Sequence, residues 1–173
     1  MQPRSSPDYL AAYPTALRQQ VAALIEQGRF AAALCQRYPQ AHTLRSDSAL
    51  YDYAQALKAE YLRSAPPLGK VRFDNTLHVI HNALGTHTAI SRVQGVRLQA
   101  KREIRIATLF RVVPEAFLRM IVVHELAHLR VREHDKAFYQ LCVHMAPDYH
   151  QCEFDLRAYL VYRDAGGEAL WGG

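Results

Sequence analysis

The chain has 173 residues, half of them hydrophobic, and a formal net charge of +5. This length suits one domain, or one domain with an extension, and the hydrophobic content excludes an intrinsically disordered chain. The basic residues are spread out and form no run of five, so we interpret them as ordinary solubility charge and leave nucleic acid open as a partner.

The cysteines and the hydropathy pattern both favour a cytoplasmic protein. Cys35, Cys142 and Cys152 are odd in number and form no C-x-x-C pair, which predicts neither a disulfide framework nor a cysteine zinc site. No uncharged apolar stretch approaches the roughly 18 residues that a membrane span needs, so no membrane association is predicted. The first fourteen residues also lack an apolar signal region.

The N-terminal third of the sequence predicts helices. Apolar residues recur at helical spacing over residues 14–27, 29–38 and 46–63, with Gly28 and Pro39 as stop signals and Ser46 as a start. The stretch 65–69 reads Ala-Pro-Pro-Leu-Gly, which is typical of a linker. We therefore predict an N-terminal helical region over residues 1–66 and a main domain over 67–173, which begins with a short helix within 73–84.

The middle of the chain predicts a small antiparallel sheet. Residues 86–92, 95–100 and 103–109 carry β-branched residues with partial alternation, and Gln94-Gly95 lies where a hairpin turn is expected. The basic residues of this region are interpreted as a solvated sheet face rather than a phosphate site, and its histidines as surface or capping residues rather than cleft residues. The basic residues are Arg92, Arg97, Lys101, Arg102 and Arg105, and the histidines are His78, His81 and His87.

The C-terminal part predicts three further helices. The first begins with Pro114 and Glu115 and continues to about Arg130, and it is apolar almost all round, which indicates a buried helix. Asp135 suits the N-cap of a helix over residues 136–145, and a last helix is expected over 151–163.

The buried helix carries a His-Glu-x-x-His motif. His124 and His128 are four residues apart and therefore lie on one face, one turn apart, where they can hold one metal ion, while Glu125 reaches a water on that ion. Two imidazoles and a carboxylate inside a core helix are costly unless something pairs with them. We favour zinc over two core histidines bonded to backbone, and over a structural zinc site, which prefers cysteine.

A catalytic zinc takes three protein ligands, so a third must come from elsewhere. Had the helix continued, His134 would lie about 9 Å beyond His128 and roughly 240° around the axis, too far to share its metal. The chain must therefore turn between Arg130 and Glu133 if His134 is the third ligand. Glu153, on the last predicted helix, is the rival third ligand, and His134 is favoured.

At this point a resemblance becomes specific. The segment HELAHLRVREHDKAFYQL, followed by Pro147-Asp148-Tyr149, resembles the YgjP-like metallopeptidase domain, a zincin group close to the SprT-like proteins. The similarity covers about residues 70–163 and is strongest over 113–149. His134 takes the third-ligand place. Glu133 and Asp135 depart from the family's usual Asn and Ser, and Leu84-Gly85-Thr86 replaces its Trp-Gly-Ser.

The resemblance implies a zincin-like fold in which a small sheet lies beside the active-site helix. Together with the elements predicted above, this gives an α+β fold with a small antiparallel sheet packed on the active-site helix and an N-terminal helical extension. The resemblance also implies a cytoplasmic zinc metallopeptidase whose metal ligands are His124, His128 and His134. Glu125 would be the general base that takes a proton from the zinc-bound water. The side chains considered for stabilising the oxyanion are Tyr149, His150, Tyr159 and His144.

Three functions remain open at this stage. A peptide or protein substrate is expected first, with an extended peptide added to a sheet edge. The same site can act on a phosphoanhydride, because a YgjP-like protein is known as a nucleoside-triphosphate pyrophosphatase. A non-catalytic zinc-containing module that binds DNA or protein is the third reading, although no zinc ribbon or basic tail supports it.

Overall fold

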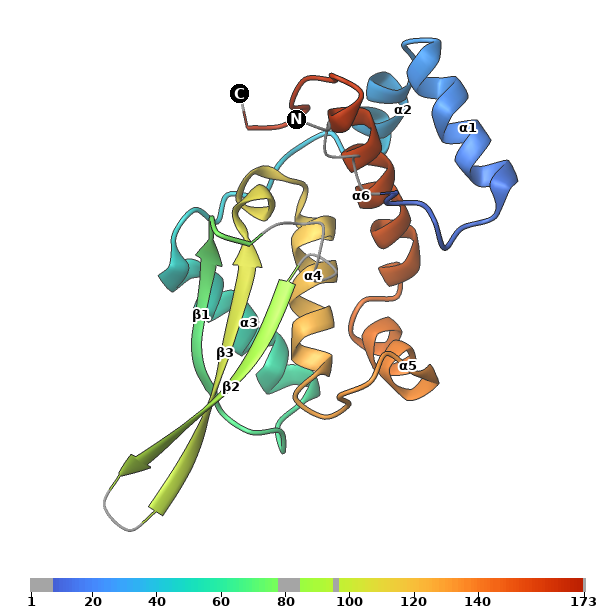
Figure 1. Cartoon of the computed structure of the whole chain (residues 1–173). Coiled ribbons are helices and arrows are strands. Elements are labelled where there is room, and N and C mark those ends of the chain that lie inside the picture. Colours follow the sequence, from blue (N-terminus) through green and yellow to red (C-terminus); the bar gives the residue numbers. More distant parts are fainter. Residues whose placement is uncertain (1–7, 78–84, 95–96, 173) are drawn as a thin grey trace, which may run out of the picture.

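Within residues 8–77, 85–94 and 97–172, which the computed structural model describes, the chain forms six α-helices and a three-stranded sheet (Figure 1). The α+β class predicted from the sequence is confirmed. The elements are, in chain order, α1 (Thr15–Glu26), α2 (Phe30–Arg37), α3 (Asp47–Tyr61), β1 (Leu68–Asp74), β2 (Gly85–Gln94), β3 (Arg97–Ala107), the 3₁₀ helix η1 (Thr108–Val112), α4 (Glu115–Ala127), α5 (Lys136–Met145) and α6 (Tyr149–Asp164). Helices α3 and α4 pack against the sheet.

The sheet is mixed rather than purely antiparallel. Strand β3 lies in the centre, with β2 antiparallel on one side and β1 parallel on the other. The predicted hairpin is confirmed, and its ladder runs from Gly85↔Ile106 to Gln94↔Arg97, while the turn residues 95–96 lie outside the described residues. The two strands predicted over 95–100 and 103–109 are one continuous strand. The prediction of an all-antiparallel sheet was wrong because β1 went unrecognised.

Strand β1 was not predicted because a β-bulge interrupts the alternation of buried and exposed residues in its sequence. Its register against β3 shifts between Leu68 and Lys70, so that Gly69 and Lys70 are both exposed before Val71 is buried. A bulge of this kind breaks the two-residue alternation that identifies a strand in a sequence. The helix predicted within 73–84 is wrong at Phe73, which is in the strand, and its residues 78–84 lie outside the described part of the chain.

Helix α3 lies behind the sheet in Figure 1 and is tied to β1 at its start. The Ser46 hydroxyl caps the helix by accepting a hydrogen bond from the Ala49 amide at 3.1 Å, as its sequence position predicted. The Asp47 carboxylate accepts a hydrogen bond from the Phe73 amide of β1 at 2.9 Å. The first bond caps the helix, and the second joins its N-terminal turn to β1.

The N-terminal helices α1 and α2 lie beside α6 (Figure 1). The C-terminal end of α2 is anchored by the buried Asp155 carboxylate of α6, which accepts hydrogen bonds from Arg37 at 2.9 Å and Tyr38 at 2.7 Å, and from Gln151 of its own helix at 3.0 Å. Phe30 of α2 also stacks on Tyr162, with ring centroids 5.2 Å apart. Buried residues from both sides of the predicted boundary share one apolar core, and the division at residue 66 stays a prediction.

Helix α4 occupies the centre of the molecule and contacts β2, β3, α3, α5 and α6. Every residue from Met120 to Ala127 is buried, as the apolar pattern predicted. Pro114 is the N-cap residue rather than the first helical residue, and the helix ends at Ala127 instead of Arg130. None of the helices in the described ranges is long and apolar enough to cross a membrane.

We expect Asp155→Ala to lower the free energy of unfolding by about 1–3 kcal/mol, because it leaves the Arg37 and Tyr38 donors without their buried acceptor. Urea unfolding followed by circular dichroism measures this change. Arg18→Ala is the control, because the Arg18–Asp8 ion pair is exposed on both sides and should contribute less than about 1 kcal/mol. Equal effects of the two substitutions would contradict a role for Asp155 as the anchor.

Candidate metal centre

Three imidazole rings meet at the C-terminal end of α4. The Nε2 atom of His134 lies 3.0 Å from Nε2 of His128 and 3.2 Å from Nε2 of His124. Two nitrogen ligands on a tetrahedral zinc ion, with bonds of about 2.0–2.1 Å, are separated by about 3.3 Å. The three rings that the sequence singled out are therefore brought together at a spacing that fits one metal ion.

The outer ring nitrogens show why the Nε2 atoms face one another. Nδ1 of His128 lies 3.0 Å from the Val131 carbonyl oxygen, which can only accept a hydrogen bond, so Nδ1 carries the proton and Nε2 keeps its lone pair. Nδ1 of His124 lies 2.7 Å from the Tyr149 hydroxyl. A single proton on His134 Nε2 can serve only one of its two neighbours, whereas a cation satisfies all three nitrogens at once.

Because α4 ends at Ala127, the following loop can bring His134 next to His124 and His128. The Leu129 amide bonds to the Leu126 carbonyl at 3.0 Å and the Arg130 amide to the Ala127 carbonyl at 3.1 Å, so the last turn tightens to i→i−3 bonding. The chain then reverses without a glycine. Asp135 begins α5 as predicted, because its carboxylate accepts a hydrogen bond from the Phe138 amide at 2.9 Å.

Phe138 supports all three histidines. Its ring is fully buried, and its centroid lies 4.9, 4.5 and 4.9 Å from those of His124, His128 and His134. The sequence predicted that Phe138 is buried but not that it forms the floor of this cluster. Each histidine ring packs against the buried Phe138 ring, and a ring in close contact cannot rotate freely, so Phe138 restricts the orientations of the histidines.

Exposure increases across the cluster, since His124 is buried, His128 is half-buried and His134 is exposed. Burial, followed by the neighbouring histidines, lowers the pKa of His124 to about 3, so this ring is neutral, which is the form that binds metals. Glu125 is 1% exposed, and burial raises its pKa to about 8. A cation at the histidines would favour the Glu125 carboxylate.

The other candidate residues lie elsewhere. Glu153, the rival third ligand, pairs with Arg157 at 3.3 Å and is not part of the cluster. Tyr149 is on the Nδ1 side of His124, which suits holding the ring rather than stabilising an oxyanion. The Tyr159 hydroxyl accepts a bond from the Leu170 amide at 3.4 Å, and His144 contacts Tyr61.

Part of the sequence interpretation lies outside the described residues. His78 and His81 fall in the segment 78–84, and the side chains of His87, Arg92, Arg97, Lys101 and Arg102 are not described. Arg105 is described, and it pairs with the buried Asp74 carboxylate at 3.0 Å rather than facing only solvent. Two contacts were missed by sequence reasoning: the Val131 carbonyl on His128 and the Tyr149 hydroxyl on His124. Only the Pro-Asp-Tyr segment hinted at the second.

Comparison with known proteins gives two matches. The model of the family described as "YgjP-like, metallopeptidase domain" matches residues 76–159, which include all three histidines and Glu125. A protein of Escherichia coli (strain K12) named UTP pyrophosphatase is 58% identical over 158 residues, which are 91% of this chain and 95% of that protein. No solved structure matches the chain significantly.

We expect the purified protein to contain one zinc ion per chain and the His128→Ala variant to lose it, because two imidazoles alone do not complete the ligand set. Native mass spectrometry combined with elemental analysis measures both. His144→Ala is the matched control, since it removes a histidine of α5 that lies outside the cluster. Retention of a full equivalent of metal by His128→Ala would contradict the assignment.

We expect Tyr149→Phe to weaken metal binding by roughly 10–100-fold, as is typical when the partner of a ligating histidine is removed. The substitution keeps the buried ring and deletes only the hydroxyl beside His124 Nδ1. Competition with a coloured chelator measures the affinity, and Tyr159→Phe is the control. An affinity equal to that of the wild type would show that the Tyr149 hydroxyl does not hold the ring.

Proposed function

The chain belongs to the YgjP-like family, and from that premise we propose that it is a metal-dependent pyrophosphatase that hydrolyses nucleoside triphosphates, with UTP among its substrates. The observation that carries this proposal is the 58% identity to a UTP pyrophosphatase over 95% of that protein's length. At this identity and coverage a shared reaction is the simplest expectation. The three-histidine cluster supports it by offering the site for a metal ion.

His124, His128 and His134 would hold the metal, and zinc suits three neutral imidazoles. When bound, the ion supplies Lewis-acid chemistry, which stabilises negative charge on phosphoryl oxygens and promotes the ionisation of water. Val131 and Tyr149 orient two of the rings through their Nδ1 atoms. These contacts keep the Nε2 atoms of His124 and His128 directed toward His134.

Glu125 follows His124 on α4 and is the proposed general base. Its carboxylate takes a proton from water while the water oxygen forms a bond to the α-phosphorus of the substrate. The bond between the α-phosphorus and the oxygen that bridges to the β-phosphorus breaks, and pyrophosphate leaves. The products are a nucleoside monophosphate and pyrophosphate, and Glu125 returns its proton to solvent or to the departing group.

A peptidase is the second candidate, because the matched family model carries that description and the His-Glu-x-x-His order fits it. The same base and metal would direct water at a peptide carbonyl instead of a phosphorus. Strand β2 lies at the sheet edge beside α4, where an extended peptide can pair. The two candidates share every proposed site residue and differ only in the substrate.

We expect the wild-type protein to convert UTP to UMP and pyrophosphate, and Glu125→Gln to lower the rate roughly 10²–10⁴-fold while keeping its metal. Phosphorus NMR identifies the products and chromatography gives the rate. Glu60→Gln, which changes an exposed glutamate of α3, should leave the rate unchanged.

The same two variants assayed with a peptide mixture separate the candidates. Peptide cleavage that depends on Glu125, together with no turnover of UTP, would replace the pyrophosphatase proposal by the peptidase. Binding of DNA or protein that is unaffected by Glu125→Gln, with no hydrolysis of either substrate, would favour a non-catalytic module.

A further inference from the structure

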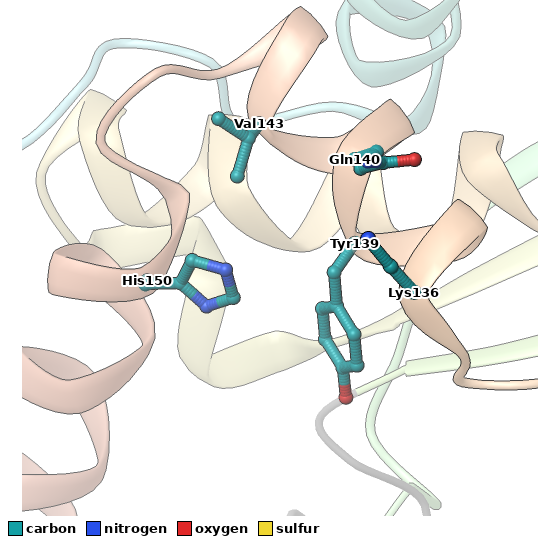
Figure 2. Close-up of a pocket in the computed structure, with 5 residues that line it drawn as sticks. All are labelled: Lys136, Tyr139, Gln140, Val143 and His150. Carbon is teal, nitrogen blue, oxygen red and sulfur yellow. The ribbon is translucent and has the colours of Figure 1, made fainter.

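An open cavity of about 310 Å³ lies between α5 and the start of α6 (Figure 2). Four of its lining residues, Lys136, Tyr139, Gln140 and Val143, recur at the spacing of one helix face and therefore line one side of α5. His150 of α6 forms the other side. We refer to these five residues as the α5 groove.

The α5 groove is connected to the metal centre through Tyr139. The Tyr139 ring centroid lies 6.5 Å from that of His134 and 5.5 Å from that of His150. Lys136, which also lines the groove, is the first residue of α5 and follows His134 by two residues in the chain. A molecule held at the histidines by one end can therefore place its next chemical group in the groove.

The lining of the groove defines what fits there. Figure 2 shows the Tyr139 phenol and the His150 imidazole next to each other, and their planes are tilted by 39° at 5.5 Å, which is a direct ring contact. A ligand ring would pack against the wall they share, together with Val143, rather than between them. The Gln140 carboxamide adds both a donor and an acceptor, Lys136 adds a positive charge, and none of the five lining residues is acidic.

We propose that the α5 groove binds the nucleoside end of a nucleotide whose phosphates lie at the histidine cluster. The base packs on the Tyr139–His150 wall, and the Lys136 ammonium faces the phosphates. This inference rests on the proposed pyrophosphatase function and extends it by naming the residues that recognise the base and ribose. It gives Tyr139 and His150 a role in binding the substrate rather than in the chemical step.

Two features favour the nucleoside over the phosphate tail or a peptide. A volume near 310 Å³ is at the small end of ligand pockets, which suits one base with its sugar rather than several peptide residues. The wall of two rings and Val143 would remove water from a phosphate without replacing its hydrogen bonds, whereas a base gains from stacking there.

We expect Tyr139→Ala and His150→Ala to raise KM for UTP by about 5–150-fold, the range for loss of one base–aromatic stack. The affinity for inorganic tripolyphosphate, measured as a competitor of UTP, should not change, because that anion has no base. Tyr139→Phe should restore KM, and kcat should change little. Tyr61→Ala is the matched control, because Tyr61 contacts His144 in a similar pair, at 5.4 Å, away from the groove.

Binding of uridine to the metal-loaded wild-type and Tyr139→Ala proteins, followed by NMR, tests the groove without any hydrolysis. Loss of uridine binding in the variant, with the metal content unchanged, supports the assignment even if UTP is not turned over. An unchanged KM for UTP, or an equal loss of tripolyphosphate affinity, would overturn it. Absence of UTP hydrolysis by the wild type would overturn the proposed function alone, so the two failures are distinguishable.

Discussion

The Nε2 atom of His134 lies 3.0 Å from that of His128 and 3.2 Å from that of His124. The backbone must therefore bring three side chains, from residues up to ten positions apart in the chain, close to one another. His124 and His128 meet this requirement through the pitch of one helix, but His134 meets it only because α4 stops at Ala127 and the chain reverses at once. Three contacts stabilise this change of direction: the i→i−3 bonds of the last turn, the contact of the Val131 carbonyl with His128, and the Asp135 cap of α5. The histidine cluster thus depends on where a helix ends, and not on the His-Glu-x-x-His motif alone.

Burying polar side chains in the core destabilises the fold, and contacts with the surrounding side chains offset this cost. Polar side chains at His124 and Glu125 are buried in a helix that is otherwise apolar, and such groups destabilise a core unless they have partners. Phe138 contacts every ring of the cluster, and Tyr149 supplies the one hydroxyl that His124 needs. The exposure that rises from His124 to His134 leaves one side of the cluster accessible to solvent while the other side is buried.

A site made of three histidines and a glutamate is compatible with more than one hydrolytic reaction. A metal with a neighbouring carboxylate directs water at either a carbonyl or a phosphoryl centre, because both develop negative charge on oxygen. Discrimination therefore depends on the groups next to the metal rather than on the ligands. The α5 groove contains Tyr139, whose ring centroid lies 6.5 Å from that of His134, and it offers aromatic surfaces and a positive charge, which is why we propose it for the nucleoside rather than for a peptide.

The sequence by itself determined the positions of the six described helices to within a few residues, the hairpin, the burial of α4 and the pairing of His124 with His128 on one helix face, because each depends on local periodicity, capping or spacing. It could not determine strand β1, whose bulge hides the alternation and whose parallel pairing joins residues more than thirty positions apart, as in Val71↔Ile104. Nor could it choose between His134 and Glu153, or show that Tyr149 lies behind His124. Those outcomes depend on how distant elements pack, and only the tertiary structure decides which side chains share one point in space.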